Sequence, residues 1–283
     1  MTIATDIVNA GEALGPSTHT NIALVGPTGS GKTTVALTYP GRKLLFDFDN
    51  RAHSAQGFPN VDVLPCYERD RDNPNAWIRF KAYLTELVNY TRKGEPLPYD
   101  VIILAGLTAM GRIAMNWSLL LDPKRGLGNT PAKQHWWPQM NTIADQVLVA
   151  CGLPCTTILE AHVDLYEEDT PEGKLHRFYP KVTGRMKEEL PNWFSEIYYT
   201  RRHEVPRKDG KMGKELVYEL ITAGTGRIEF AKSSMNQLGR YWTDPVVVDF
   251  DQEPVGLAKL LALRYGVNVG SPVSSTIDDA PES

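Results

Sequence analysis

Short apolar runs alternate with segments of helical periodicity along most of this chain. Fully apolar runs bounded by turn residues are typical of strands that a parallel sheet buries on both faces. Strands that alternate with helices predict an α/β fold whose sheet is mainly parallel and flanked by helices. The predicted strands cover residues 21–25, 42–49, 61–65, 99–105, 155–161, 196–201, 216–223 and 246–249.

Helical spacing of apolar side chains marks the segments between these strands. Over residues 75–92, for example, Trp77, Phe80, Leu84 and Leu87 recur three or four positions apart. Residues 122–137 and 163–180 are polar or broken by glycine and proline, so we predict loops there. The remaining predicted helices cover residues 34–39, 107–121, 138–150 and 254–265.

The chain has 283 residues and shows no convincing linker, which favours one domain over residues 20–269 with a small β extension after about Pro191. Residues 1–19 are small and polar and predict a flexible arm. Residues 270–283 are rich in serine, proline and aspartate and predict a disordered tail.

Composition narrows the classes of protein. The net charge of −4 argues against a globally basic nucleic-acid binder but leaves room for a local basic face. Three cysteines are too few, and wrongly spaced, for a disulfide framework or a four-ligand zinc site. No run approaches the ~18 apolar residues of a membrane span, and no signal-peptide pattern opens the chain. We therefore expect a cytoplasmic protein with reduced thiols and no membrane partner.

The most specific motif is GPTGSGKTT at residues 26–34, which matches the phosphate-binding pattern G-x-x-x-x-G-K-[ST]. It lies between a predicted strand and a predicted helix, where glycines let backbone N–H groups converge on an anion. The motif predicts that Lys32 contacts the β- and γ-phosphates of ATP and that the Thr33 hydroxyl contacts Mg²⁺. The predicted nucleotide contacts in the motif are Gly26, Pro27, Thr28, Gly29, Ser30, Gly31, Lys32, Thr33 and Thr34.

Proteins with this motif differ in the position of the acid that activates water. The predicted strand over 99–105 ends in Ala105 and Gly106 and offers no carboxylate there. The strand over 42–49 instead ends in Asp47 and Asp49, so only an acid at the end of the second strand is available.

The chain resembles the RecA-like phage ATPases, that is, the minimal-core recombinases and single-strand-annealing proteins of bacteriophages. The resemblance spans roughly residues 21–237. It rests on GPTGSGKTT, LLFDFD at 44–49, residues 99–108, the strand ending in His162, residues 182–201 and Ala231-Lys232-Ser233. It implies a RecA-like P-loop ATPase in the cytoplasm of a phage-infected bacterium, using ATP and Mg²⁺. The implied partners are single-stranded DNA, further copies of the chain with nucleotide between subunits, and a single-strand-binding protein.

The resemblance also implies roles for individual residues. Asp49 falls where the family carries the acid that polarises the attacking water, and His162 where a polar residue senses the γ-phosphate. Lys232 falls where a neighbouring subunit supplies a phosphate ligand. Ala105 replaces the magnesium aspartate of the family, and Asp47 could hold a magnesium-bound water instead. Asp49 could equally cap a helix or a turn, and His162 could be a structural histidine.

Cations and aromatics share the segment 122–137, where His135 precedes Trp136 and Trp137. Single-stranded nucleic acid needs charge for its phosphates and flat faces for its bases. Adjacent tryptophans on an extended segment point in opposite directions, so we expect one to be buried. By the resemblance, this loop and the loop 163–180, with His176, face DNA, although the first could equally be a disordered, merely soluble loop. The predicted DNA contacts are Lys124, Arg125, Lys133, Trp136, Lys174 and Arg177.

Two functions remain open at this point. One is a DNA-dependent ATPase that promotes annealing or strand exchange. The other is a non-enzymatic nucleotide-binding module that serves as a recombination mediator or assembly factor, which the alanine at position 105 favours. A small-molecule P-loop kinase is a weaker third choice, because the chain has no arginine-rich lid.

Overall fold

The computed structural model of the protein describes residues 19–70, 72–122, 124, 130–170, 173–207, 213–234 and 244–265. In this part of the chain, eight strands form one sheet in the order β10-β9-β8-β1-β5-β4-β2-β3. All neighbours are parallel except β9, which runs antiparallel to both β8 and β10. The strands are β1 (Ile22–Val25), β2 (Lys43–Asp47), β3 (Val61–Pro65), β4 (Val101–Ala105), β5 (Thr156–Ala161), β8 (Glu196–Pro206), β9 (Lys214–Ile221) and β10 (Val246–Val248).

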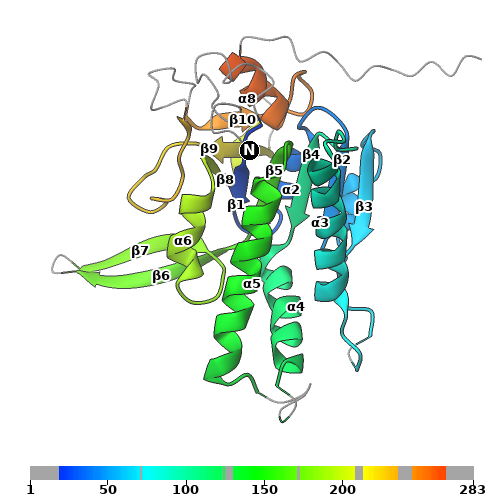
Figure 1. The fold of residues 1–283 in the computed structure, drawn as a ribbon. Helices are drawn as coiled ribbons and strands as arrows, with labels where there is room; N and C mark the ends of the chain where they lie inside the picture. The colour runs from blue at the N-terminus through cyan, green and yellow to red at the C-terminus, as the bar shows by residue number, and fades with distance from the viewer. Residues whose placement is uncertain are drawn as a thin grey trace, which may run out of the picture.

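Helices cover both faces of the sheet (Figure 1) because successive side chains of each buried strand point to opposite sides. Phe46 and Leu104 pack in the cluster with α3, α4, α5 and α6, whereas Leu45 and Ile103 pack in the cluster with α2, η2 and α8. None of the helices in the described residues is long and apolar enough to cross a membrane. The helices are α2 (Lys32–Leu37), η2 (Ala52–Ala55), α3 (Ala76–Lys93), α4 (Leu107–Leu120), α5 (Lys133–Cys151), α6 (Met186–Trp193) and α8 (Gly256–Tyr265).

The predicted fold class is confirmed, and most strand ends agree with the sequence to within about two residues. Strand β8 continues to Pro206, and α6 has no counterpart among the predicted elements. The predicted arm, apart from His19, and the predicted tail lie outside the described residues.

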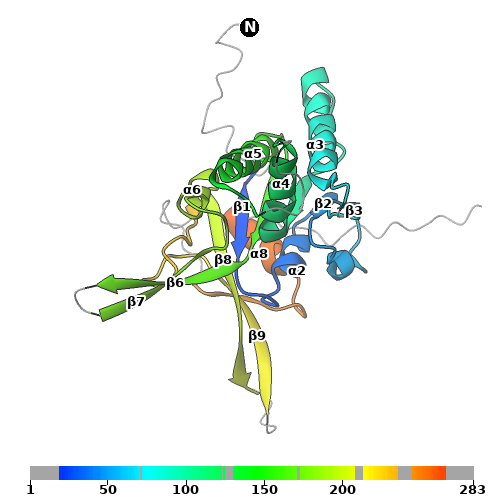
Figure 2. The ribbon, with the colours of Figure 1, turned by 90° about the horizontal axis from the view of Figure 1, so that it is seen from below.

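The prediction of a loop over 163–180 was wrong. Strands β6 (Val163–Thr170) and β7 (Gly173–Pro180) pair as an antiparallel hairpin that projects from the body (Figures 1 and 2). The polar composition of this segment favours a loop. In the hairpin, the rings of Tyr166 and Tyr179 pack edge to face with their centroids 5.4 Å apart. The ammonium of Lys187 on α6 lies 4.2 Å from the Tyr166 ring centroid, a cation–π contact between the hairpin and α6.

The prediction of a loop as far as residue 137 was also wrong, because α5 begins at Lys133. His135 is buried and organises the junction of α4 and α5. Its Nδ1 accepts a hydrogen bond from the Ala132 backbone, and its Nε2 lies 3.3 Å from the Asp122 carboxylate. Helical geometry leaves Trp136 40% and Trp137 64% exposed, so neither is the buried tryptophan that an extended segment predicted.

Candidate nucleotide-binding site

The phosphate-binding loop connects β1 to α2 at the carboxyl edge of the sheet. Gly26 leaves β1 against β8, and a side-chain carbon there would collide with the hydroxyl and carbonyl oxygens of Thr200. Gly31 adopts a positive φ of 84° directly before α2, a backbone conformation that glycine accepts without strain. Both glycines are therefore required by the path of the chain, and the loop ends at a helix N-terminus suited to an anion.

Lys32 is buried inside this loop. Its Nζ donates hydrogen bonds of 2.9 Å to the carbonyls of Gly26 and Pro27 and lies 3.5 Å from His162 Nδ1. Burial lowers the pKa of Lys32 to about 8, an effect that the nearby carboxylates of Glu160 and Asp49 oppose. The ammonium group thus lies where the motif predicts a phosphate-binding cation.

His162 follows β5, and its ring faces Lys32. Burial, together with the charge of Lys32, lowers the pKa of His162 below its ordinary value, so the ring is neutral at pH 7. The ring lies 3.5 Å from the Lys32 ammonium and also hydrogen-bonds to the Gly26 backbone, so the tautomer sets which ring nitrogen donates. In either tautomer His162 carries one ring N–H donor in the pocket.

Asp47 and Asp49 also reach the pocket, but their surroundings differ. The Asp47 carboxylate accepts hydrogen bonds from the backbone N–H groups of Arg51 and Ala52, at 3.1 and 3.3 Å, and so caps η2. Asp49 Oδ2 lies 3.7 Å from Arg51 Nε. Burial, and then the charge of Asp47, raises the pKa of Asp49, which suits an acid that can exchange a proton.

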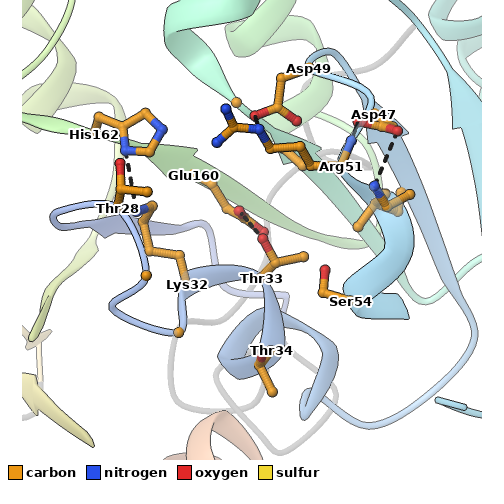
Figure 3. A pocket seen from close by; sticks show the side chains of 16 residues that line it. Thr28, Lys32, Thr33, Thr34, Asp47, Asp49, Arg51, Ser54, Glu160 and His162 are labelled. Atoms are coloured by element: carbon orange, nitrogen blue, oxygen red, sulfur yellow. Dashed lines mark hydrogen bonds and ion pairs between the residues drawn. The ribbon is translucent and has the colours of Figure 1, made fainter. Parts of the chain in front are cut away.

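Glu160 on β5 is a site residue that the sequence reasoning missed. The Thr33 hydroxyl donates a hydrogen bond of 2.7 Å to Glu160 Oε2, and the Glu160 residue is only 4% exposed (Figure 3). Burial raises its pKa to about 7, opposed by the Thr33 hydrogen bond and the charge of Lys32. A signal existed in the sequence, because an acid within a predicted buried strand rarely lies there without a specific partner.

These residues line one cavity of about 230 Å³, which joins the predicted Lys32, Thr33, Asp47, Asp49 and His162 to Glu160. A second cavity of about 1200 Å³ lies next to it and shares four lining residues with it. Three arginines from separate segments reach this second cavity, but three acids line it as well, so its charges are mixed. The arginines are Arg51, Arg69 and Arg112, beside Asp49, Glu68 and Asp72.

Lys232 lies away from these cavities. Its backbone pairs with Ile197 on β8, and Ile197 is in register with Ala23, well before the phosphate-binding loop. Lys232 therefore does not line the nucleotide cavity of its own chain. Its predicted role towards a neighbouring subunit stays a prediction.

The predicted DNA contacts fall on two separate elements. Lys124 and Lys133 are exposed near the junction of α4 and α5. Lys174 and Arg177 lie on the β6–β7 hairpin and form ion pairs with Glu167 and Glu229, which neutralise part of their charge. Arg125 lies outside the described residues.

Comparison with known proteins agrees with this geometry. The family model described as an AAA domain matches residues 18–252. The chain belongs to this AAA domain family. With its mostly parallel sheet and its phosphate-binding loop, it has the architecture of a P-loop ATPase domain.

No curated protein matches the chain. Among solved structures, it is similar to a KaiC-like protein of Pyrococcus horikoshii, with 11% identity, a TM-score of 0.38, and coverage of 71% of this chain and 77% of that one. It is also similar to the flagellar accessory protein FlaH of Methanocaldococcus jannaschii, with 8% identity, a TM-score of 0.36, and coverage of 81% and 84%. These TM-scores are low, so the family match carries the assignment.

Proposed function

We propose that the protein hydrolyses ATP and acts on single-stranded DNA, promoting annealing or strand exchange in a phage-infected bacterial cell. One observation carries the proposal. Lys32, Asp49 and His162 converge on one cavity, and a second cavity with three arginines and three acids in its lining lies directly beside it. The first cavity suits a nucleotide, and the arginines of the second offer contacts to the phosphates of another ligand.

The residues of the loop would bind the phosphates. Backbone N–H groups at the start of α2 and the ammonium of Lys32 supply positive charge, and phosphate oxygens would replace the carbonyls of Gly26 and Pro27 around Nζ. Magnesium, when bound, would neutralise charge on the β- and γ-phosphates. Asp49 would orient the attacking water, and a ring N–H of His162 would donate to the γ-phosphate side of the cavity.

The DNA part of the proposal draws on the position of the polar elements. Strand β4 leads into α4, and β5 leads into the β6–β7 hairpin, so both elements leave the carboxyl edge where ligands of open α/β sheets bind. Trp136 and Trp137 are exposed near Lys133, which combines stacking faces with a cation. Self-association would bring Lys232 of one copy to the nucleotide of the next, and a single-strand-binding protein is a further proposed partner.

A non-enzymatic nucleotide-binding module is the second candidate. Ala105 ends β4 without a carboxylate and lines the nucleotide cavity, which favours a protein that binds ATP without turnover. In that case the nucleotide would stabilise an oligomer or a recombination mediator.

The deciding experiment measures ATP turnover by the full chain with and without single-stranded DNA, together with DNA binding by gel shift. Stimulated turnover that Lys32→Ala abolishes would support the first candidate. Nucleotide binding without turnover, in the presence and absence of DNA, would support the second. Turnover that single-stranded DNA does not change, with no DNA binding, would contradict the DNA part of the proposal.

A further inference from the structure

We propose that Glu160 on β5 holds the magnesium ion that accompanies the nucleotide, in place of an aspartate at the end of β4. This inference rests on the proposed ATP binding. In the sheet, Glu160 is in register with Ala105 on one side and with Leu24 on the other. Glu160 therefore lies at the same level as the alanine at the expected aspartate position, but one strand, or about 4.8 Å, nearer to the phosphate-binding loop.

The hydrogen bond with Thr33 is the first support. In P-loop ATPases a threonine or serine of the loop and an acidic side chain together hold magnesium. Here the Thr33 hydroxyl donates to Glu160 Oε2 at 2.7 Å, and both residues line the nucleotide cavity. Because Leu24, Ala105 and α2 belong to one core cluster, the register directs Glu160 to the face of the sheet that carries Thr33.

The second support is an unsatisfied atom. Glu160 Oε1 is buried and has no hydrogen-bond partner among the described residues, although buried carboxylate oxygens are nearly always paired. Magnesium prefers such hard oxygen ligands, and in nucleotide sites one or two carboxylates usually suffice beside waters and phosphates. The donor set of Thr33, one free carboxylate oxygen and the phosphates fits that preference.

Asp47, the residue that the sequence favoured for this role, is less suited to it. Its carboxylate is engaged by the backbone N–H groups of Arg51 and Ala52, which hold η2 in place. Asp49 faces the guanidinium of Arg51. Of the three acids that line the nucleotide cavity, Glu160 is the one whose carboxylate is hydrogen-bonded to Thr33.

Electrostatics makes the proposal testable without turnover. A buried carboxylate close to the phosphates repels them strongly unless a cation lies between the two. Nucleotide affinity should therefore depend on magnesium, and removal of the Glu160 charge should remove that dependence.

The experiment titrates the full chain with ADP by calorimetry, in Mg²⁺ and in EDTA. For the wild type we expect ADP affinity to be higher in Mg²⁺ than in EDTA by ~10-fold or more, because the ion screens the phosphates from the Glu160 carboxylate; partners of a metal site contribute about 10–100-fold to metal affinity. In Glu160→Gln this ratio should fall to about 1, while affinity in EDTA stays equal or increases. Glu204→Gln, the same change at an exposed ion pair with Lys214, is the matched control and should keep the wild-type ratio.

If Glu160→Gln keeps the wild-type ratio of ADP affinity in Mg²⁺ to that in EDTA, the proposal is overturned. If Asp47→Asn loses this ratio and Glu160→Gln does not, the role returns to Asp47. If Glu160→Gln fails to fold, as circular dichroism would show, Glu160→Asp replaces it and must lower the ratio. The variant Glu160→Gln with Ala105→Asp, which returns an acid to β4, should recover part of the ratio. A wild type that binds no nucleotide in either buffer overturns the proposed function, whereas equal wild-type affinity in both buffers overturns only the proposal for Glu160.

Discussion

The ammonium of Lys32 donates a hydrogen bond of 2.9 Å to the carbonyl of Gly26, the first residue of its own loop. A buried ammonium group needs such partners, because an unpaired charge in the protein interior is costly. The loop therefore holds its cation at the centre of the phosphate cradle by main-chain hydrogen bonds, and a phosphate would compete with carbonyls rather than with water.

Replacement of Lys32 by alanine should abolish ATP binding, since the phosphates lose their point cation. Titration with a fluorescent ATP analogue measures the affinity. Lys93→Ala, at the exposed end of α3, is the control and should bind like the wild type. Unchanged affinity in Lys32→Ala would refute the assignment of the nucleotide site to this loop.

Replacement of Asp49 by asparagine should keep ATP affinity but slow hydrolysis by ~10² or more, which is the usual contribution of a positioned general base. The affinity persists because the Asp49 carboxylate pairs with Arg51 rather than with a side chain of the phosphate-binding loop. Steady-state phosphate release measures the rate, with the exposed Asp62→Asn as control. Equal turnover in Asp49→Asn would point to Asp47 as the acid.

The exposed cations and aromatics near the start of α5 should contribute separably to DNA affinity. Neutralising Lys124 and Lys133 should make the slope of log affinity against log salt shallower by about 0.7 for each phosphate that is no longer bound, or up to ~1.4. Trp137→Ala should instead cost ~1–3 kcal/mol of stacking and leave the slope nearly unchanged. Fluorescence anisotropy with labelled single strands at several salt concentrations measures both effects.

A buried tryptophan provides the control for that experiment. Trp77 is 1% exposed and donates to the Thr142 hydroxyl at 3.2 Å, so Trp77→Ala should lower stability by about 3–5 kcal/mol. Trp137→Ala should leave the melting temperature unchanged. Wild-type affinity and slope in the double lysine variant would exclude this end of α5 as a DNA-binding element.

The cysteine thiols should react slowly in the folded protein. Burial raises the pKa values of Cys66, Cys151 and Cys155 to about 12 each, so at pH 8 all three are protonated. Cys66 and Cys155 are buried, whereas Cys151 is only partly buried. A disulfide reagent at pH 8 should therefore label Cys151 first and the other two only when the chain unfolds. Rapid labelling of Cys66 or Cys155 in the native protein would show that their segments open locally.

Two arginine ion pairs should contribute differently to the free energy of unfolding. Arg264 on α8 contacts the carboxylate of Glu196, which is fully buried, so Arg264→Met should cost about 3 kcal/mol by leaving that charge without its cation. Arg42→Met breaks an exposed pair with Asp62 and should cost less than about 1 kcal/mol. Urea unfolding compares the two, and equal losses would contradict the assignment of Glu196 as a buried charged partner.

The phosphate-binding loop and the buried strands could be predicted from the sequence because their causes are local. Glycines, a lysine and a helix start stand within nine consecutive residues of the motif, and each central strand is a short apolar run. The same local reasoning failed for the first turn of α5, although it predicted the helix over 138–150, and for the β6–β7 hairpin. A proline and several polar residues concealed the first, and cross-strand pairs such as Tyr166 with Tyr179 stabilise the second.

The position of Glu160 could come only from the tertiary structure. Its strand follows β1 by more than a hundred residues, and the sequence does not state that β5, rather than β4, pairs with β1. That order decides which strand lies next to β1, and therefore which side chains can reach Thr33 at the start of α2. Strand order depends on how helices pack on both faces of the sheet, so it is a property of the whole core and not of any segment.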